Sequence, residues 1–204
     1  MADINRPIRV RNYTLRELEQ IAKDHSANLG KYINGYRVDL ELFIESEFKL
    51  RIESFFQLRK RYSIYAFTAI GTSYIFVDDD LLDDPMKEKK LRFTIGEEFA
   101  HTLIHREIYL DCMSVDQRIA KDGLFEEESR LRLETNARAL SGMFLMPKDL
   151  VERRVEEVIA KTGAQTIEAV ANEIKDDFDV NFKAARFRLK HLGYHKRGLQ
   201  EEGY

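Results

Sequence analysis

The chain has 204 residues, of which 44% are hydrophobic and 34% are charged, and its net charge is −3. This length suffices for one domain, or for one domain with a small appendage, around a real core. The composition excludes a disordered chain, and the small net charge gives no bulk electrostatic reason to bind nucleic acid or an anionic membrane. The single cysteine, Cys112, excludes an internal disulfide and a cysteine-rich zinc site.

The first thirty residues carry charges every few positions. They contain no uninterrupted apolar stretch of the kind that signal peptides and membrane spans need. We therefore expect a cytoplasmic protein with no membrane partner, and a reducing compartment suits a chain with one thiol.

In the N-terminal half, two helices precede a group of strands. The stretch from Thr14 to Glu17 is a capping box before apolar residues at helical spacing, which predicts a helix that ends near residues 28–30. Asp39 is a suitable N-cap for a second helix. Runs with strand character follow at residues 50–56, 62–67 and 73–77, with a short turn at residues 70–72.

The rest of the chain is expected to be mostly helical. Residues 91–108 place their apolar side chains on one stripe, which is typical of an amphipathic, largely buried helix. Polar residues 111–123 predict a loop, and residues 125–145 predict a second long helix that Pro147 stops. Further helices are expected over residues 148–161 and 167–178 and, after an N-cap at Asn181, up to residues 192–193. Together these elements predict an α+β fold.

The first long helix contains Glu97-Glu98-Phe99-Ala100-His101, one residue away from the H-E-x-x-H pattern with which helices present zinc ligands and a general base. Residues four apart on a helix differ by about 40° around its axis, so Glu97 and His101 can hold one ion together. Glu98 takes the position of the general base, which removes a proton from metal-bound water. A catalytic zinc needs a third protein ligand. Our candidate is Glu134.

These stretches resemble the ImmA/IrrE-type metallo-endopeptidases, whose active-site helix reads roughly F-T-x-x-H-E-x-x-H. The likeness covers much of the chain, including residues 36–41 and 74–78 upstream, and is faintest after Pro147. On a second helix the family has a glutamate and ends in Leu-Met-Pro, as does this chain from Glu134 to Pro147. Leu140-Ser141 stands where the family tends to have Phe-Ala. The matching residues of the first helix are Phe93-Thr94-Ile95-Gly96-Glu97-Glu98-Phe99-Ala100-His101.

The resemblance implies a zincin-like active-site helix packed on a small mixed or antiparallel sheet, with additional C-terminal helices. We expect a metallopeptidase domain over residues 1–161 and a small helical module over residues 162–204. Carried over to this chain, the zinc ligands would be Glu97, His101 and Glu134, with Glu98 as the catalytic base. The implied substrate is a protein such as a DNA-binding repressor.

Glu97 stands where the family has histidine, and this departure leaves two interpretations open. A carboxylate can ligate zinc, although two carboxylates and one histidine make the ion a poorer Lewis acid. Alternatively, the chain is a catalytically degenerate member that acts as a regulatory protein-binding module. Without a metal, three crowded carboxylates push at least one toward its protonated form, so the site needs a cation. His105, one turn beyond His101, is an alternative ligand.

Each candidate also has a plain structural interpretation. The glutamates could form solvated surface pairs, His101 and His105 could be hydrogen-bonded core histidines, and Cys112 fits an incidental loop thiol. Residues 178–188 resemble a turn before a recognition helix. Because acidic and basic residues balance in the C-terminal part, we expect packing or partner recognition there, not direct nucleic-acid binding.

Overall fold

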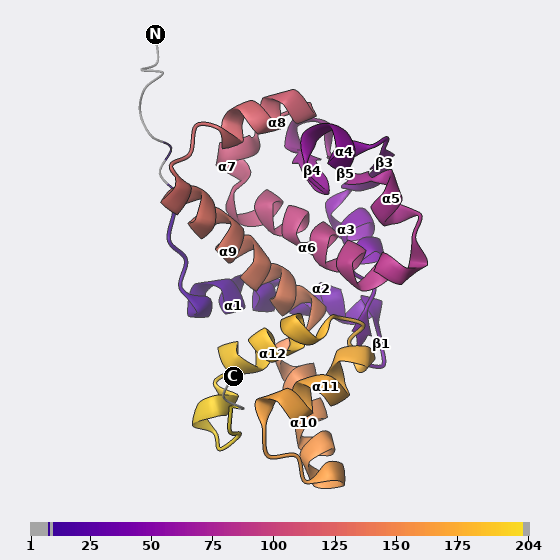
Figure 1. Cartoon of the computed structure of the whole chain (residues 1–204), viewed down its shortest axis with the longest axis vertical. Helices are drawn as coiled ribbons and strands as arrows, with labels where there is room; N and C mark the ends of the chain where they lie inside the picture. The colour runs from indigo at the N-terminus through magenta and orange to yellow at the C-terminus, as the bar shows by residue number, and fades with distance from the viewer. Residues whose placement is uncertain (1–7, 9, 202–204) are drawn as a thin grey trace.

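The computed structural model describes residue 8 and residues 10–201 of the chain. Residues 1–7 and 9 of the predicted metallopeptidase domain and residues 202–204 of the predicted helical module lie outside the described residues. Helices surround one small sheet, which confirms the α+β class (Figure 1). The strands are β1 Ile33–Asn34, β2 Arg37–Val38, β3 Arg51–Phe55, β4 Ala66–Ala69 and β5 Tyr74–Asp78. The α-helices of the described residues are α1 Leu15–Asp24, α2 Ser26–Leu29, α3 Leu40–Phe48, α4 Leu58–Tyr62, α5 Asp79–Leu82, α6 Glu88–Ile104, α7 Arg106–Tyr109, α8 Val115–Asp122, α9 Glu127–Leu145, α10 Lys148–Thr162, α11 Ile167–Asp177 and α12 Phe182–His191.

The main sheet has three strands in the order β3-β5-β4. β3 runs parallel to β5, whereas β4 runs antiparallel to it, so the sheet is mixed. All four residues of the edge strand β4 are buried. The short pair β1 and β2 forms a separate hairpin, whose turn uses Gly35 at φ +63°, a conformation that glycine adopts readily.

The centre of the molecule is the crossing of α6 and α9, which pack against each other in the middle of Figure 1. Phe99 of α6 lies between the rings of Phe48 and Phe144, with ring centroids 4.7 and 5.1 Å away. α6 also contacts β4 and β5, so the helix lies between the sheet and α9. Contacts on two faces therefore hold α6, the helix that carries the candidate site, in position.

Two sequence predictions were wrong on the sheet side of the molecule. The strand predicted at residues 62–67 lies further along the chain, because α4 ends at Tyr62 and β4 begins only at Ala66. Residues 111–123 are not a loop but contain α8. The Ser114 hydroxyl accepts a hydrogen bond from the Gln117 N–H and caps this helix, and α8 buries Val115 and Arg118.

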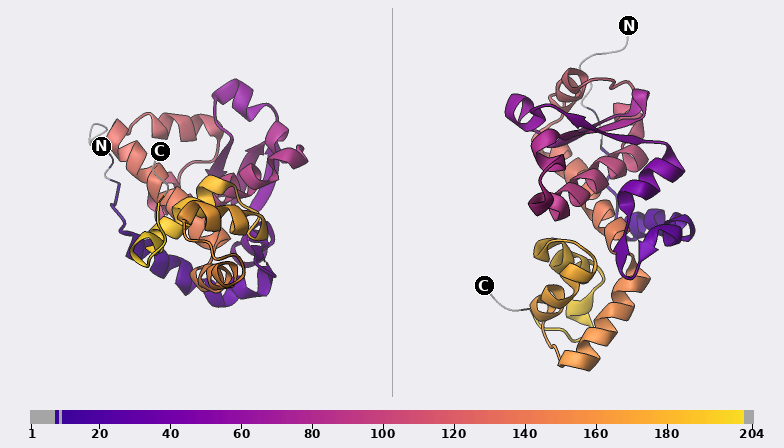
Figure 2. Two further views of the ribbon diagram at one scale, coloured as in Figure 1. Left: turned by 60° about the horizontal axis from the view of Figure 1, so that its bottom comes forward. Right: turned by 90° about the vertical axis from the view of Figure 1, so that its right-hand side faces the viewer.

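The C-terminal helices α10, α11 and α12 lie together at one end of the molecule, beyond α9 (Figure 2). Buried Arg188 of α12 joins them to α1 and to the end of α9, since it donates to the Glu19 carboxylate and to the Met146 carbonyl. The division into two units at residue 161 stays a prediction. Within the described ranges, no helix has the length and apolarity that a membrane crossing requires.

The close approach of α6 to α9 depends on Gly96. A Cβ atom at this position would collide with the Ser141 hydroxyl and would lie 3.2 Å from Leu40 Cδ2. The Ser141 hydroxyl itself donates to the Phe93 carbonyl at 3.1 Å and so joins the two helices. Gly142 of α9 provides a matched comparison, because a Cβ there would meet nothing within 4 Å.

We predict that Gly96→Ala lowers the free energy of unfolding by about 1–3 kcal/mol, because the added methyl group overpacks the crossing. Gly142→Ala should instead raise it by about 0.5–1 kcal/mol, since alanine favours the helix and the position has room. Urea denaturation of both variants measures the difference. Equal effects of the two substitutions would contradict the account of the crossing.

Candidate active site

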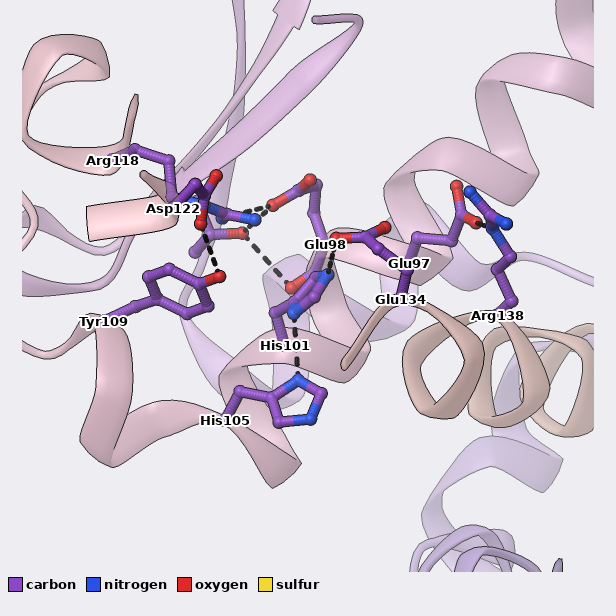
Figure 3. Close-up of polar contacts among 10 residues, drawn as sticks. Glu97, Glu98, His101, His105, Tyr109, Arg118, Asp122, Glu134 and Arg138 are labelled. Carbon is purple, nitrogen blue, oxygen red and sulfur yellow. Dashed lines mark hydrogen bonds and ion pairs between the residues drawn. The ribbon is translucent and has the colours of Figure 1, made fainter. Parts of the chain in front are cut away.

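Three of the four predicted site residues, Glu97, Glu98 and Glu134, line one cleft of about 720 Å³ at the α6–α9 crossing, and the fourth, His101, is buried. Glu97, Glu98 and His101 project from α6, and Glu134 faces them from α9 (Figure 3). The sheet side of the cleft is closed by residues of β4 and of the segment before it, and α8 covers one end. Sequence reasoning therefore placed these side chains in one neighbourhood.

His101 and Glu134 are two predicted zinc ligands that lie close together. His101 Nε2 and Glu134 Oε1 are 3.7 Å apart, which is too long for a direct hydrogen bond. Burial lowers the pKa of His101 well below its ordinary value, with further lowering by Arg118 and His105, so the imidazole is neutral. The Nδ1 atoms of His101 and His105 are 2.9 Å apart. His105 thus lies behind His101, on the side away from the carboxylates (Figure 3).

Glu98 is held by groups from the sheet and from α8. The buried Thr68 hydroxyl donates to Glu98 Oε2 at 2.9 Å and lies 3.1 Å from the Glu98 carbonyl. A guanidinium nitrogen of Arg118 lies 3.4 Å from the same carboxylate oxygen. Glu98 is only 7% exposed, so its charge is balanced by this arginine and not by water.

Arg118 is a buried cation at the end of the cleft. Its Nε donates to both carboxylate oxygens of Asp122 at 3.0 and 3.2 Å, and its guanidinium stacks on the Tyr109 ring at 3.9 Å. The Tyr109 hydroxyl donates to Asp122 at 2.7 Å and completes the cage. Burial lowers the pKa of Arg118, but Glu98, Tyr109 and Asp122 raise it above its ordinary value, so the side chain stays charged.

Glu97 turns toward a different partner, Arg138 of α9. The Arg138 Nε donates to Glu97 Oε1 at 3.0 Å. Burial raises the pKa of Glu97 to about 7, because the lowering by Arg138 only partly opposes burial and the charges of Glu134 and Glu98. Burial, followed by the charge of Glu98, also raises the pKa of Glu134. The crowded carboxylates therefore resist ionisation, as the sequence predicts.

A family model described as the IrrE N-terminal-like domain, of the M78 peptidases, matches residues 48–190 of this chain. The chain belongs to this family. The match confirms the resemblance inferred from the sequence and covers all four predicted site residues. Membership makes the protein metallopeptidase-like and suggests a metal, most simply zinc. A search of curated proteins found no match.

The side chains present do not fit a three-ligand zinc site in their observed arrangement. Among the described residues, no group of three or more His, Cys, Asp or Glu side chains is positioned to hold a metal ion. Two of the carboxylates that could bind a metal already have cationic partners. Glu97 forms an ion pair with Arg138, and Glu98 forms one with Arg118. His101 and Glu134 lie at a distance that one ion could bridge.

Sequence reasoning missed the two arginines. Arg118 lay in the segment predicted as a loop, although Ser114 and Gln117 have capping-box spacing and Arg118 and Asp122 have the i, i+4 spacing of a helical ion pair. These two patterns could have predicted α8. Arg138 follows Glu134 by four residues, but nothing in the sequence says that it reaches across to Glu97.

We predict that Glu97 titrates near pH 7 and that Arg138→Gln raises its pKa further, because the guanidinium stabilises the carboxylate. The folded-state pKa lies above the ordinary value of 4.5, so the stability that protonated Glu97 contributes is present below that pH and lost as the pH rises through about 7. Carboxyl carbon NMR follows the titration, and urea denaturation across this range follows the stability.

Arg132→Gln serves as the control, since Arg132 lies on the same helix but pairs with exposed Glu128. The control should leave the Glu97 midpoint unchanged. A midpoint near 4.5 that neither substitution moves would show that burial and Arg138 do not act on Glu97 as described.

Proposed function

We propose that this metallopeptidase-like protein is a regulatory protein-binding module that holds a partner in the α6–α9 cleft without hydrolysing it. One observation carries the proposal: the buried guanidinium of Arg118 lies 3.4 Å from Glu98, the residue in the position of the general base. In the metallopeptidase pattern that base acts beside a divalent cation. In this protein the guanidinium of Arg118 already balances the charge of Glu98.

The electrostatic energies indicate that Arg118, and not Arg138, is the main group that opposes a metal ion in the cleft. Two like unit charges roughly 4 Å apart repel by about 4 kcal/mol near a protein surface, so a divalent ion beside Arg118 is disfavoured. Arg118 cannot move away freely, because Asp122 and Tyr109 hold its side chain, which is 6% exposed. The Arg138 side chain is 56% exposed, and exposed pairs contribute only about 0–1 kcal/mol.

We propose a protein as the occupant of the cleft, with a DNA-binding repressor as the expected class. The family resemblance is the basis for that class. A polypeptide is a suitable occupant because the lining of the cleft combines charged side chains with apolar ones, among them Tyr62, Ile64 and Leu131.

A zinc-dependent endopeptidase is the second candidate, and the pairing of His101 with Glu134 favours it. His101 Nε2 and Glu134 Oε1 lie 3.7 Å from each other, and the imidazole is neutral, as a metal ligand must be. In this alternative Glu97 leaves Arg138 to join the ligands, and Glu98 is the base. The sequence alone favoured this alternative, and the buried Arg118 shifts the balance away from it.

Metal affinity separates the two functions. We predict that the purified chain holds no stoichiometric zinc and that Glu97→His alone does not create a tight site, because Arg118 stays in place. The double variant Glu97→His with Arg118→Met should bind zinc at least about tenfold more tightly than Glu97→His, since one repulsive charge is gone. Calorimetric titration with zinc, together with thermal melting to verify folding, measures this.

One equivalent of zinc in the natural chain, lost in His101→Ala and Glu134→Ala, would establish the second candidate instead. Glu98→Gln gives an independent comparison. Under the binding function this substitution leaves the cellular phenotype intact, whereas a folded Glu98→Gln protein without function would contradict the proposal.

A further inference from the structure

A cluster of unpaired cations lies beside the cleft, on the helix that joins β3 to β4. Arg59, Lys60 and Arg61 are consecutive on α4, and Lys90 comes from the first turns of α6. All four are exposed, and none forms an ion pair with any residue that the structure describes. Arg11 and Arg197 are also exposed, but each pairs with a glutamate. We call the four residues the α4 basic patch.

The carboxylates of nearby acidic residues accept hydrogen bonds from backbone N–H groups of this segment. Buried Asp78 accepts a hydrogen bond from the Arg59 N–H at 2.7 Å, and Asp79 accepts one from the Gln57 N–H at 2.9 Å. These bonds fix the start of α4, where Gln57 adopts a left-handed conformation. These two carboxylates therefore hold the backbone of α4 and form no ion pair with its cationic side chains.

Aromatic rings hold the patch in position. The Tyr65 ring contacts two of the cations, with the Lys90 Nζ 3.1 Å and the Arg59 Cζ 4.8 Å from its centroid. Arg61 lies 5.1 Å from the centroid of Tyr62. Such contacts order the cations before a partner arrives, which lowers the entropy lost on binding.

Tyr62 and Tyr65 also line the cleft, so the patch and the cleft form one continuous surface. The cleft itself contains more acidic than basic side chains. Its lining includes five carboxylates and three guanidiniums, namely Glu97, Glu98, Asp122, Glu127 and Glu134 with Arg118, Arg130 and Arg138.

We propose that the α4 basic patch binds an acidic segment of the polypeptide partner, next to the portion that occupies the cleft. This inference rests on the proposed function, because it assumes that a polypeptide lies there. A nucleic acid carries a phosphate at every residue and would bring like charge to the carboxylates of the cleft. A polypeptide can place its acidic side chains over α4 and neutral or basic ones beyond it, which matches the observed change of sign.

The test uses fluorescence anisotropy with three labelled probes: a glutamate-rich peptide, its glutamine counterpart and a single-stranded DNA of similar length. We expect the full chain to bind the glutamate peptide best, with an affinity that falls as salt rises. The variant Arg59→Gln/Lys60→Gln/Arg61→Gln should weaken this binding by about tenfold, the sum of three modest surface pairs.

The matched control is Lys161→Gln/Lys183→Gln/Lys196→Gln, which removes three exposed cations of the C-terminal part that form no ion pair with a described residue. It should leave binding unchanged. Equal weakening by both variants, or tighter binding of the DNA that the α4 variant abolishes, would overturn the inference. Neither result would change the outcome of the zinc titration. Failure of the inference about the α4 basic patch is therefore distinguishable from failure of the proposed function.

Discussion

Three glutamates from two crossing helices share one largely buried cleft, and the positive charge that balances them determines what the site can do. Arg118 is the central source of that charge. It reaches Glu98 from α8, and Asp122 and Tyr109 fix its position. In a metallopeptidase site a divalent ion would supply this charge and would also activate water. A guanidinium balances the carboxylate but activates no water, and under the proposed function the same fold serves as a binding surface.

The replacement at position 97 and the position of Arg118 are consistent with each other. A glutamate at the first ligand position forms an ion pair with Arg138, and Arg118 lies beside the neighbouring Glu98. The close packing of α6 on α9 at Gly96 keeps these groups within reach of one another. The family scaffold is therefore preserved while its charge arrangement differs.

The sequence predicted the α6–α9 pair well, because long amphipathic stripes and a Met-Pro ending are strong local signals. It also identified Glu97, Glu98, His101 and Glu134 as neighbours. It failed at α4 and α8, where short helices depend on caps and tertiary burial and not on periodicity. Arg118 was missed for the same reason, since its role depends on a distance across the cleft that no spacing along the chain encodes.

The most direct test of the central claim is a crystal structure of the chain grown with zinc, with anomalous scattering recorded at the zinc edge. The account predicts no anomalous peak between His101 and Glu134, and a guanidinium beside Glu98. A full-occupancy peak bonded to Glu97, His101 and Glu134, with Arg118 displaced from Glu98, would contradict it.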